Sequence, residues 1–111
     1  MSFKPIIIVA GEPYSVFLEI FFKTLKVKKI KKPIILIASY HLVVAQMKVL
    51  NFNFKINIIT KNIPQTKDLE NTAINLINVD FKFKEKFDKI SSKSNSYINK
   101  SFEIALNLLK T

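Results

Sequence analysis

Few residues of this 111-residue sequence could do chemistry, and they form no known catalytic pattern. The absence of cysteine excludes a thiolate metal site, a cysteine nucleophile and a disulfide scaffold. His41 is the single histidine, and its position at the start of a predicted helix favours a surface or capping role over catalysis. The acidic residues are not spaced as metal ligands, and neither a Ser-x-x-Lys nor a Gly-x-Ser-x-Gly motif occurs. The residues alone therefore predict no catalytic side chain and no metal ligand.

Gly11 is the only glycine, and it begins the segment Gly11-Glu12-Pro13. A chain that uses glycine once is expected to need it for its backbone, either for a positive φ or for the close approach of another group. Gly11 follows the apolar run Lys4–Ala10, at the strand end where α/β folds bind ligands. A tight turn without a ligand is the simpler interpretation. The later glycines of a dinucleotide fingerprint and the GK[ST] ending of a Walker loop are both absent.

Four apolar runs are predicted to be the strands that position these residues. Lys4–Ala10 and Pro33–Ala38 are continuous and rich in isoleucine, which is typical of strands buried on both faces. Phe52–Ile59 alternates in part between apolar and polar residues, and Ile74–Val79 is a weaker candidate. Between these two runs, Thr60–Asn71 is polar and is expected to be an exposed loop.

Three helices are predicted between and after the strands. The first extends from Val16 to about Leu25 with Ser15 as N-cap, and the second extends from Tyr40 to Leu50 with Ser39 as N-cap. The third, Ser94 to Lys110, has the clearest helical spacing of apolar residues. The residues expected to face the core are Val16, Phe17, Ile20, Phe21 and Leu25 in the first helix, with Phe22 widening the stripe, Val43, Met47 and Leu50 in the second, and Ile98, Phe102, Ala105 and Leu109 in the third, with Tyr97, Ser101, Ile104 and Leu108 beside them.

The element order β-α-β-α-β-β-α predicts one α/β domain over residues 1–111, with three layers (α/β/α) and a mainly parallel sheet. The length allows one domain with one core. An α/β unit ordinarily returns to the sheet after a helix such as Ser94–Lys110. The sequence is therefore expected to be the amino-terminal part of a longer chain.

The net charge is +10, and all 18 basic residues are lysine. Proteins that read bases or grip phosphates usually use arginine, whose planar group reaches two acceptors at once. The six lysines of Lys23–Lys32 therefore favour a solvated helix end over a phosphate-binding patch. No apolar run approaches the roughly 18 residues that span a bilayer. A cytoplasmic protein with no specific nucleic-acid partner and no membrane partner is expected.

The segment from Gly11 to Ile20 reads GEPYSVFLEI and directly follows the first predicted strand. It resembles the G-[DE]-P-A-G-I-G-P-E-[IL] signature with which 4-hydroxythreonine-4-phosphate dehydrogenases begin. Ser15 and Phe17 replace the second and third glycines of that signature, and Val16 replaces its isoleucine. The residues that match the signature are Gly11, Glu12, Pro13, Glu19 and Ile20, and weaker similarity follows at Lys32–Ala38, Leu42–Leu50 and Ser94–Leu109.

The resemblance implies an NAD-dependent enzyme that oxidises and decarboxylates 4-hydroxythreonine 4-phosphate in pyridoxal phosphate biosynthesis. It implies an isocitrate/isopropylmalate dehydrogenase-like fold, a cytoplasmic homodimer, a divalent metal and a phosphorylated small-molecule substrate. By the same resemblance, Gly11, Glu12 and Pro13 border the substrate and cofactor cleft. The metal ligands and catalytic residues of the family lie beyond the segment that this sequence matches. The 111-residue segment alone is thus expected to be inactive and to bind neither NAD nor metal.

Two other interpretations stay open. A small stand-alone α/β ligand-binding module is compatible with the element order, although a receiver domain is not, because the third strand ends in Ile59-Thr60 rather than in a phosphoacceptor aspartate. A lysine-rich protein that binds polyanions is the second, and it predicts retention that weakens steeply with salt.

Overall fold

The computed structural model describes residues 5–11, 13–14, 16–27, 33–60, 64, 66–70, 72–81 and 95–110. Its elements confirm the predicted α/β class and element order, with one short 3₁₀ helix, η1, added in the predicted loop. The strands are β1 (Ile6–Val9), β2 (Ile34–Ala38), β3 (Ile56–Ile58) and β4 (Ile74–Asn78), and the helices are α1 (Phe17–Val27), α2 (Tyr40–Val49), η1 (Thr66–Asp68) and α3 (Asn95–Leu109).

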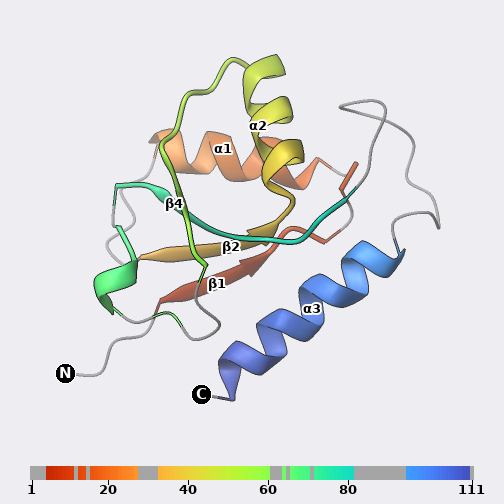
Figure 1. Cartoon of the computed structure of the whole chain (residues 1–111). Helices are drawn as coiled ribbons and strands as arrows, with labels where there is room; N and C mark the ends of the chain where they lie inside the picture. The colour runs from red at the N-terminus through yellow and green to blue at the C-terminus, as the bar shows by residue number, and fades with distance from the viewer. Residues whose placement is uncertain are drawn as a thin grey trace.

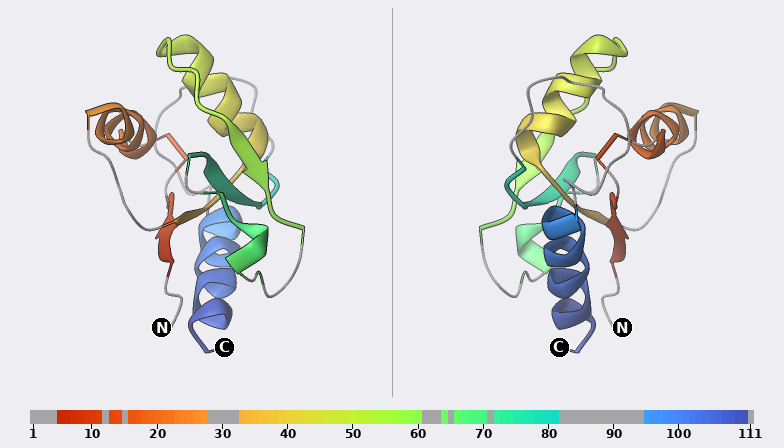
Figure 2. Two further views of the ribbon diagram at one scale, coloured as in Figure 1. Left: turned by 90° about the vertical axis from the view of Figure 1, so that its left-hand side faces the viewer. Right: turned by 90° about the vertical axis from the view of Figure 1, so that its right-hand side faces the viewer.

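The four strands form one parallel sheet in the order β1-β2-β4-β3. Helices α1 and α2 cover one face and α3 covers the other, so the predicted three layers are present (Figure 1). The crossovers through α1 and α2 lead across the sheet from β1 towards β3. The chain then returns from β3 to β4 in the opposite direction, past η1 on the face of α3, as right-handed connections require (Figure 2).

The core has two unequal parts, one on each face of the sheet. The larger part lies between the sheet and helices α1 and α2, and its centre includes Phe22, Leu36 and Val43. The smaller part lies under α3 and joins Ile37 of β2 to Tyr97 of the helix. β2 contributes to both parts and is buried throughout, as predicted, because it lies in the middle of the sheet.

β1 corrects the prediction that the first strand is buried on both faces. Ile6 is 41% exposed, and the residues after it are only half-buried. Among the described residues β1 pairs with β2 alone and therefore forms an edge of the sheet. A continuous apolar run indicates that a strand is suited to burial, but it does not show whether a second neighbour is present.

The apolar faces of α1 and α3 agree with the prediction only in part. In α1, Phe21 and Phe22 are buried as predicted, whereas Leu18 is buried in addition and Val16, before the helix, and Ile20 are exposed. Each helix is apolar around more of its circumference than the sheet can cover, so only the side towards the sheet is buried. In α3 that side is Tyr97, Ser101 and Ala105, and the predicted core residues Phe102 and Leu109 are exposed.

Helix α2 follows the prediction more closely. Val43 and Met47 are buried as expected, and Leu50 is half-buried at the helix end. After it, Asn51 adopts a left-handed conformation with φ 63°, which asparagine tolerates better than most residues and which ends the helix. The third strand is shorter than the predicted Phe52–Ile59, and the rings of Phe52 and Phe54, which precede it, pack on Phe22.

Asn75, buried in the central strand β4, explains why that strand gave a weak apolar signal. Its Nδ2 donates to the carbonyl oxygens of Ile34 (3.0 Å) and Glu70 (2.8 Å). Its Oδ1 accepts from the Glu70 amide (2.8 Å) and from Nδ2 of Asn57 (2.9 Å). All four hydrogen-bonding positions of the amide are used. Asn75 thereby ties the segment after η1 to the sheet.

Candidate functional site

The candidate site lies at the carboxyl ends of the strands, where the Gly11 segment begins. The Ala10 amide donates to the Ile37 carbonyl (3.1 Å), so β1 stays paired with β2 up to Gly11. Gly11 has φ +69°, in the left-handed region that strains any residue with a Cβ. A Cβ built on Gly11 would meet no atom within 4 Å. Backbone conformation, rather than close packing, is what requires glycine here, and it is the first of the two predicted reasons.

Pro13 is held by a residue that sequence reasoning missed. Its carbonyl oxygen accepts a hydrogen bond from Nε2 of Gln46 (3.1 Å), which is fully buried in α2. Gln46 lies on the same helix face as Val43 and Met47, so its spacing could have identified it as an inward-facing polar residue. Glu12, the other predicted cleft residue, lies outside the described residues, as does Ser15.

Helix α2 begins at the same edge, and its first amides bind the chain's own side chains. Ser39 is the N-cap, as predicted, and its Oγ accepts from the Leu42 amide (3.3 Å). The Ser39 amide donates to Oη of Tyr97 (2.9 Å), and the Tyr40 amide donates to Oδ1 of Asn78 (2.8 Å). Helix amino termini bind phosphate through such amides. An anion could use these donors only by displacing internal hydrogen bonds.

Tyr97 connects α3 to this edge across a separation of 58 residues from Ser39. Burial raises the pKa of its phenol to about 12, and the hydrogen bond from the Ser39 backbone opposes that shift. Tyr97 is therefore a neutral phenol at neutral pH. The Phe81 ring lies 5.0 Å from the Tyr97 ring and 5.7 Å from the Tyr14 ring. A row of three aromatic rings thus joins the turn after β1 to the end of β4 and to α3.

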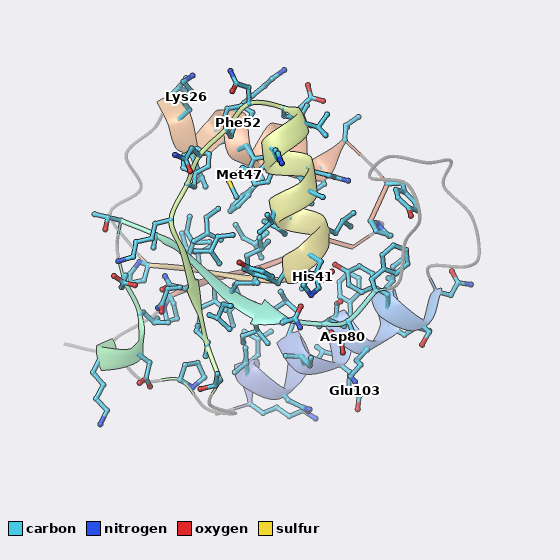
Figure 3. The ribbon with its side chains drawn as sticks, turned by 45° about the horizontal axis from the view of Figure 1, so that its top comes forward. Lys26, His41, Met47, Phe52, Asp80 and Glu103 are labelled. Carbon is cyan, nitrogen blue, oxygen red and sulfur yellow. The ribbon has the colours of Figure 1, made fainter. Side chains whose placement is uncertain are left out.

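Asp80 and His41 are exposed titratable side chains at this edge (Figure 3). Asp80 follows β4, and its Oδ1 accepts from Nδ2 of Asn78 (3.1 Å). His41 lies in the first turn of α2 with its ring edge-on to Tyr40, 5.5 Å between centroids. Its exposure agrees with the predicted surface role.

The described residues do not by themselves fit a divalent metal or a dinucleotide. No three His, Cys, Asp or Glu side chains among them come together as metal ligands. The segment after Gly11 has no further glycine to bring a backbone against a pyrophosphate. No reaction step through a metal or NAD is therefore assigned to these residues. Their polar groups can orient a ligand at the edge, with Asp80 and His41 available to bind it.

The described lysines near α1 and β3 lie away from this edge. Lys23 pairs with Glu19 and Lys55 pairs with Glu70, each at 2.8 Å and each exposed. Nζ of Lys26 lies 5.7 Å from the centre of the Phe52 ring. Exposed ion pairs of this kind contribute about 0–1 kcal/mol. These contacts agree with a solvated lysine-rich surface, although residues 28–32 of the predicted lysine run lie outside the described part.

Comparison with known proteins adds no identification. No family model matches the sequence, and no curated protein matches it. Within the described part of the chain, no helix is long and apolar enough to cross a membrane. Function is therefore argued from the Gly11 segment and from the geometry of the carboxyl edge.

Proposed function

We propose that this chain forms the amino-terminal α/β part of an NAD-dependent dehydrogenase that oxidises and decarboxylates 4-hydroxythreonine 4-phosphate. The supporting observation is the left-handed backbone of Gly11 at the carboxyl end of β1. It is the first residue of the segment GEPYSVFLEI, which resembles the signature of that family. A substrate cleft at this edge requires a tight turn after β1. Gly11 provides it, because its left-handed backbone lies at the sheet edge where α/β folds bind ligands.

In this proposal the turn that begins at Gly11 forms one wall of the substrate and cofactor cleft. Gln46 holds the Pro13 carbonyl, and Tyr97 fixes the start of α2. Asp80 and His41 offer an acidic and a basic side chain to the polar groups of a phosphorylated substrate. NAD, the divalent metal and the catalytic groups are assigned to residues other than those described. The homodimer, the cytoplasmic location and the role in pyridoxal phosphate biosynthesis belong to the same proposal.

Phe17 shows how one departure from the family signature is accommodated. It occupies the position of the third signature glycine and begins helix α1. Its ring packs against Phe21, 6.1 Å between centroids, and joins the core between α1 and the sheet. The larger side chain therefore adds packing behind the turn, and Gly11 supplies the special backbone conformation at the edge.

The experiment is to read the coding sequence beyond residue 111 and to assay the protein that it encodes. We expect an open frame, and a purified full chain that reduces NAD when given 4-hydroxythreonine 4-phosphate and a divalent metal. A full chain that folds but leaves NAD oxidised under these conditions would refute the proposal. A natural 111-residue protein that binds a small molecule without NAD chemistry would instead support a stand-alone binding module.

A further inference from the structure

We propose that a groove between β1 and α3 binds a free medium-chain fatty acid, with the alkyl chain along the groove and the carboxylate at Lys110. The groove has a volume of about 300 Å³ and lies between the first strand and the last helix. The inference is independent of the dehydrogenase activity proposed above, because the site uses neither the Gly11 segment nor His41 and Asp80.

The lining of the groove selects an apolar ligand. Every described residue that lines it is apolar, with Ile7 and Val9 on the strand wall and Leu106 and Leu109 on the helix wall. A polar group placed between these walls would give up hydrogen bonds to water without finding a partner. An unbranched alkyl chain has no such group to lose.

The helix wall offers apolar surface that a ligand can remove from water. Phe102, Leu106 and Leu109 lie on one face of α3, and each is half or more exposed. Ala105 on the same wall is buried, and its short side chain leaves room above it. Contiguous apolar surface of this kind on a folded chain marks a binding site, because covering it is favourable.

The length of the groove fits one extended alkyl chain. From Phe102 to Leu109 the helix rises by about 10 Å, at about 1.5 Å per residue. From Pro5 to Val9 the strand advances by about 13 Å, at about 3.3 Å per residue. A zigzag chain with carbon–carbon bonds of about 1.5 Å covers this length with about eight to ten carbons. A medium-chain fatty acid therefore extends along the groove from end to end.

Two charges on the α3 segment give the ligand a direction. Lys110 directly follows Leu109, is exposed, and makes no ion pair within the described part of the chain. Glu103 directly follows Phe102, towards the other end of the groove, and is exposed as well. A carboxylate is attracted by the lysine and repelled by the glutamate, so the head of the ligand lies at the Leu109 end. The net charge of +10 adds a long-range attraction for anions.

Charge also favours this ligand over two other occupants of an apolar groove. A second copy of the chain brings a further charge of +10 and is repelled at low ionic strength, whereas a fatty acid brings a negative charge. Helices that lie on anionic membranes carry a strongly basic polar face. Residues 95–110 carry two lysines and one glutamate, which is too little positive charge for that role.

The test is a titration of the protein with sodium decanoate below its micellar concentration, followed by the amide NMR signals of each residue. We expect saturable shifts confined to β1 and α3, with a Kd on the order of 0.1–1 mM for a ligand of this size in an open groove. Shifts spread evenly over α1 and α2, or shifts that do not saturate, would overturn the inference.

A series of chain lengths tests whether the groove has the proposed dimensions. We expect the Kd to fall about twofold to fourfold for each methylene from hexanoate to decanoate, because each buried methylene is removed from water. The Kd should then level off beyond about ten carbons, where the chain extends past the groove. Adsorption to a general apolar surface continues to strengthen with chain length, and a series without a plateau would contradict the groove.

A matched pair of variants tests the helix wall. Leu106 on α3 is 57% exposed and Ile20 on α1 is 56% exposed, so Leu106→Ser and Ile20→Ser both replace side chains that already face solvent. Leu106→Ser is expected to weaken decanoate binding at least threefold, while Ile20→Ser leaves it unchanged. Equal Kd values for the two variants would exclude the groove as the binding site.

A second pair tests the position of the carboxylate. Lys110→Gln is expected to weaken decanoate binding at least twofold, and Lys100→Gln, at another exposed lysine of α3, is the control without effect. Decyltrimethylammonium has an alkyl chain of the same length with the opposite charge and should bind at least threefold more weakly than decanoate. Equal binding of the two probes would refute an anionic ligand.

Sedimentation of the protein without ligand covers the remaining occupant. We expect a monomer at the concentrations used for the titration. A dimer that Leu106→Ser dissociates would assign the groove to a second copy and overturn the fatty-acid site.

Discussion

Two borders of the sheet are built from different kinds of contact. At the carboxyl ends of the strands, hydrogen bonds and aromatic rings tie four separate segments together, and the amides at the start of α2 donate to internal oxygen atoms. At the free edge of β1, apolar side chains of the strand and of α3 line an open groove. The first border is organised by internal contacts of the chain, and the second exposes apolar side chains to solvent.

The difference shows where each kind of interaction is decisive. Polar contacts at the carboxyl edge depend on geometry, so losing one partner leaves a buried group unsatisfied. The stability due to apolar contacts at the β1 edge is proportional to the apolar area that they remove from water. Side chains that are already exposed there contribute little, so replacing them costs little. Substitutions at the carboxyl edge are therefore expected to cost more than substitutions in the groove.

The largest effect is expected for Gly11→Val. A β-branched side chain at φ +69° is strained, and we expect the free energy of unfolding to fall by about 2–3 kcal/mol. Gly11→Asn is the matched control, because asparagine tolerates this region and Asn51 already adopts φ 63° in this chain. Urea unfolding followed by circular dichroism measures both. An unchanged midpoint for Gly11→Val would show that the left-handed turn is not required.

Tyr97→Phe is expected to cost about 2 kcal/mol at neutral pH, because the Ser39 amide loses its acceptor in a buried place. Tyr40→Phe is the control, since it removes a hydroxyl from the same edge without affecting this bond. Equal losses for the two variants would argue that the bond between α2 and α3 contributes nothing specific.

The same residue predicts a dependence on alkaline pH. The pKa of Tyr97 is about 12 in the folded chain and near 10 in the unfolded chain, so between these values only the unfolded state releases the proton. The stability due to the neutral phenol is complete below pH 10 and decreases as the pH rises towards 12. Unfolding at several pH values should show the advantage of the native protein over Tyr97→Phe shrinking across this interval. A constant difference would contradict a buried neutral phenol.

Gln46→Leu is expected to have a smaller effect, about 1 kcal/mol, because the apolar replacement keeps most of the packing while the Pro13 carbonyl loses its donor. In the full chain of the proposed dehydrogenase, the loosened turn is expected to raise KM for the substrate more than it lowers kcat. Steady-state kinetics would measure both constants. An unchanged KM would place the turn away from the substrate.

Much of the fold could be predicted because local signals were sufficient for it. The Ser39 cap, the apolar run of β2 and the single glycine at the end of β1 each specify local structure, and the structure agrees with them. The edge position of β1 could not be predicted, since it depends on which strands are neighbours rather than on the strand itself. The bond between Ser39 and Tyr97 was equally hidden, because no pattern joins residues 58 positions apart.

The smallest effect is expected in the groove of the 111-residue chain. Leu106→Ser removes an apolar side chain that already faces solvent, so the free energy of unfolding should change by less than about 0.5 kcal/mol. Leu76→Ser, at a fully buried position of β4, should instead cost about 3 kcal/mol or more, because it removes buried apolar area. Urea unfolding of the two variants and of the unsubstituted chain measures this difference directly. Equal losses for Leu106→Ser and Leu76→Ser would show that the groove contributes as much to stability as the core does.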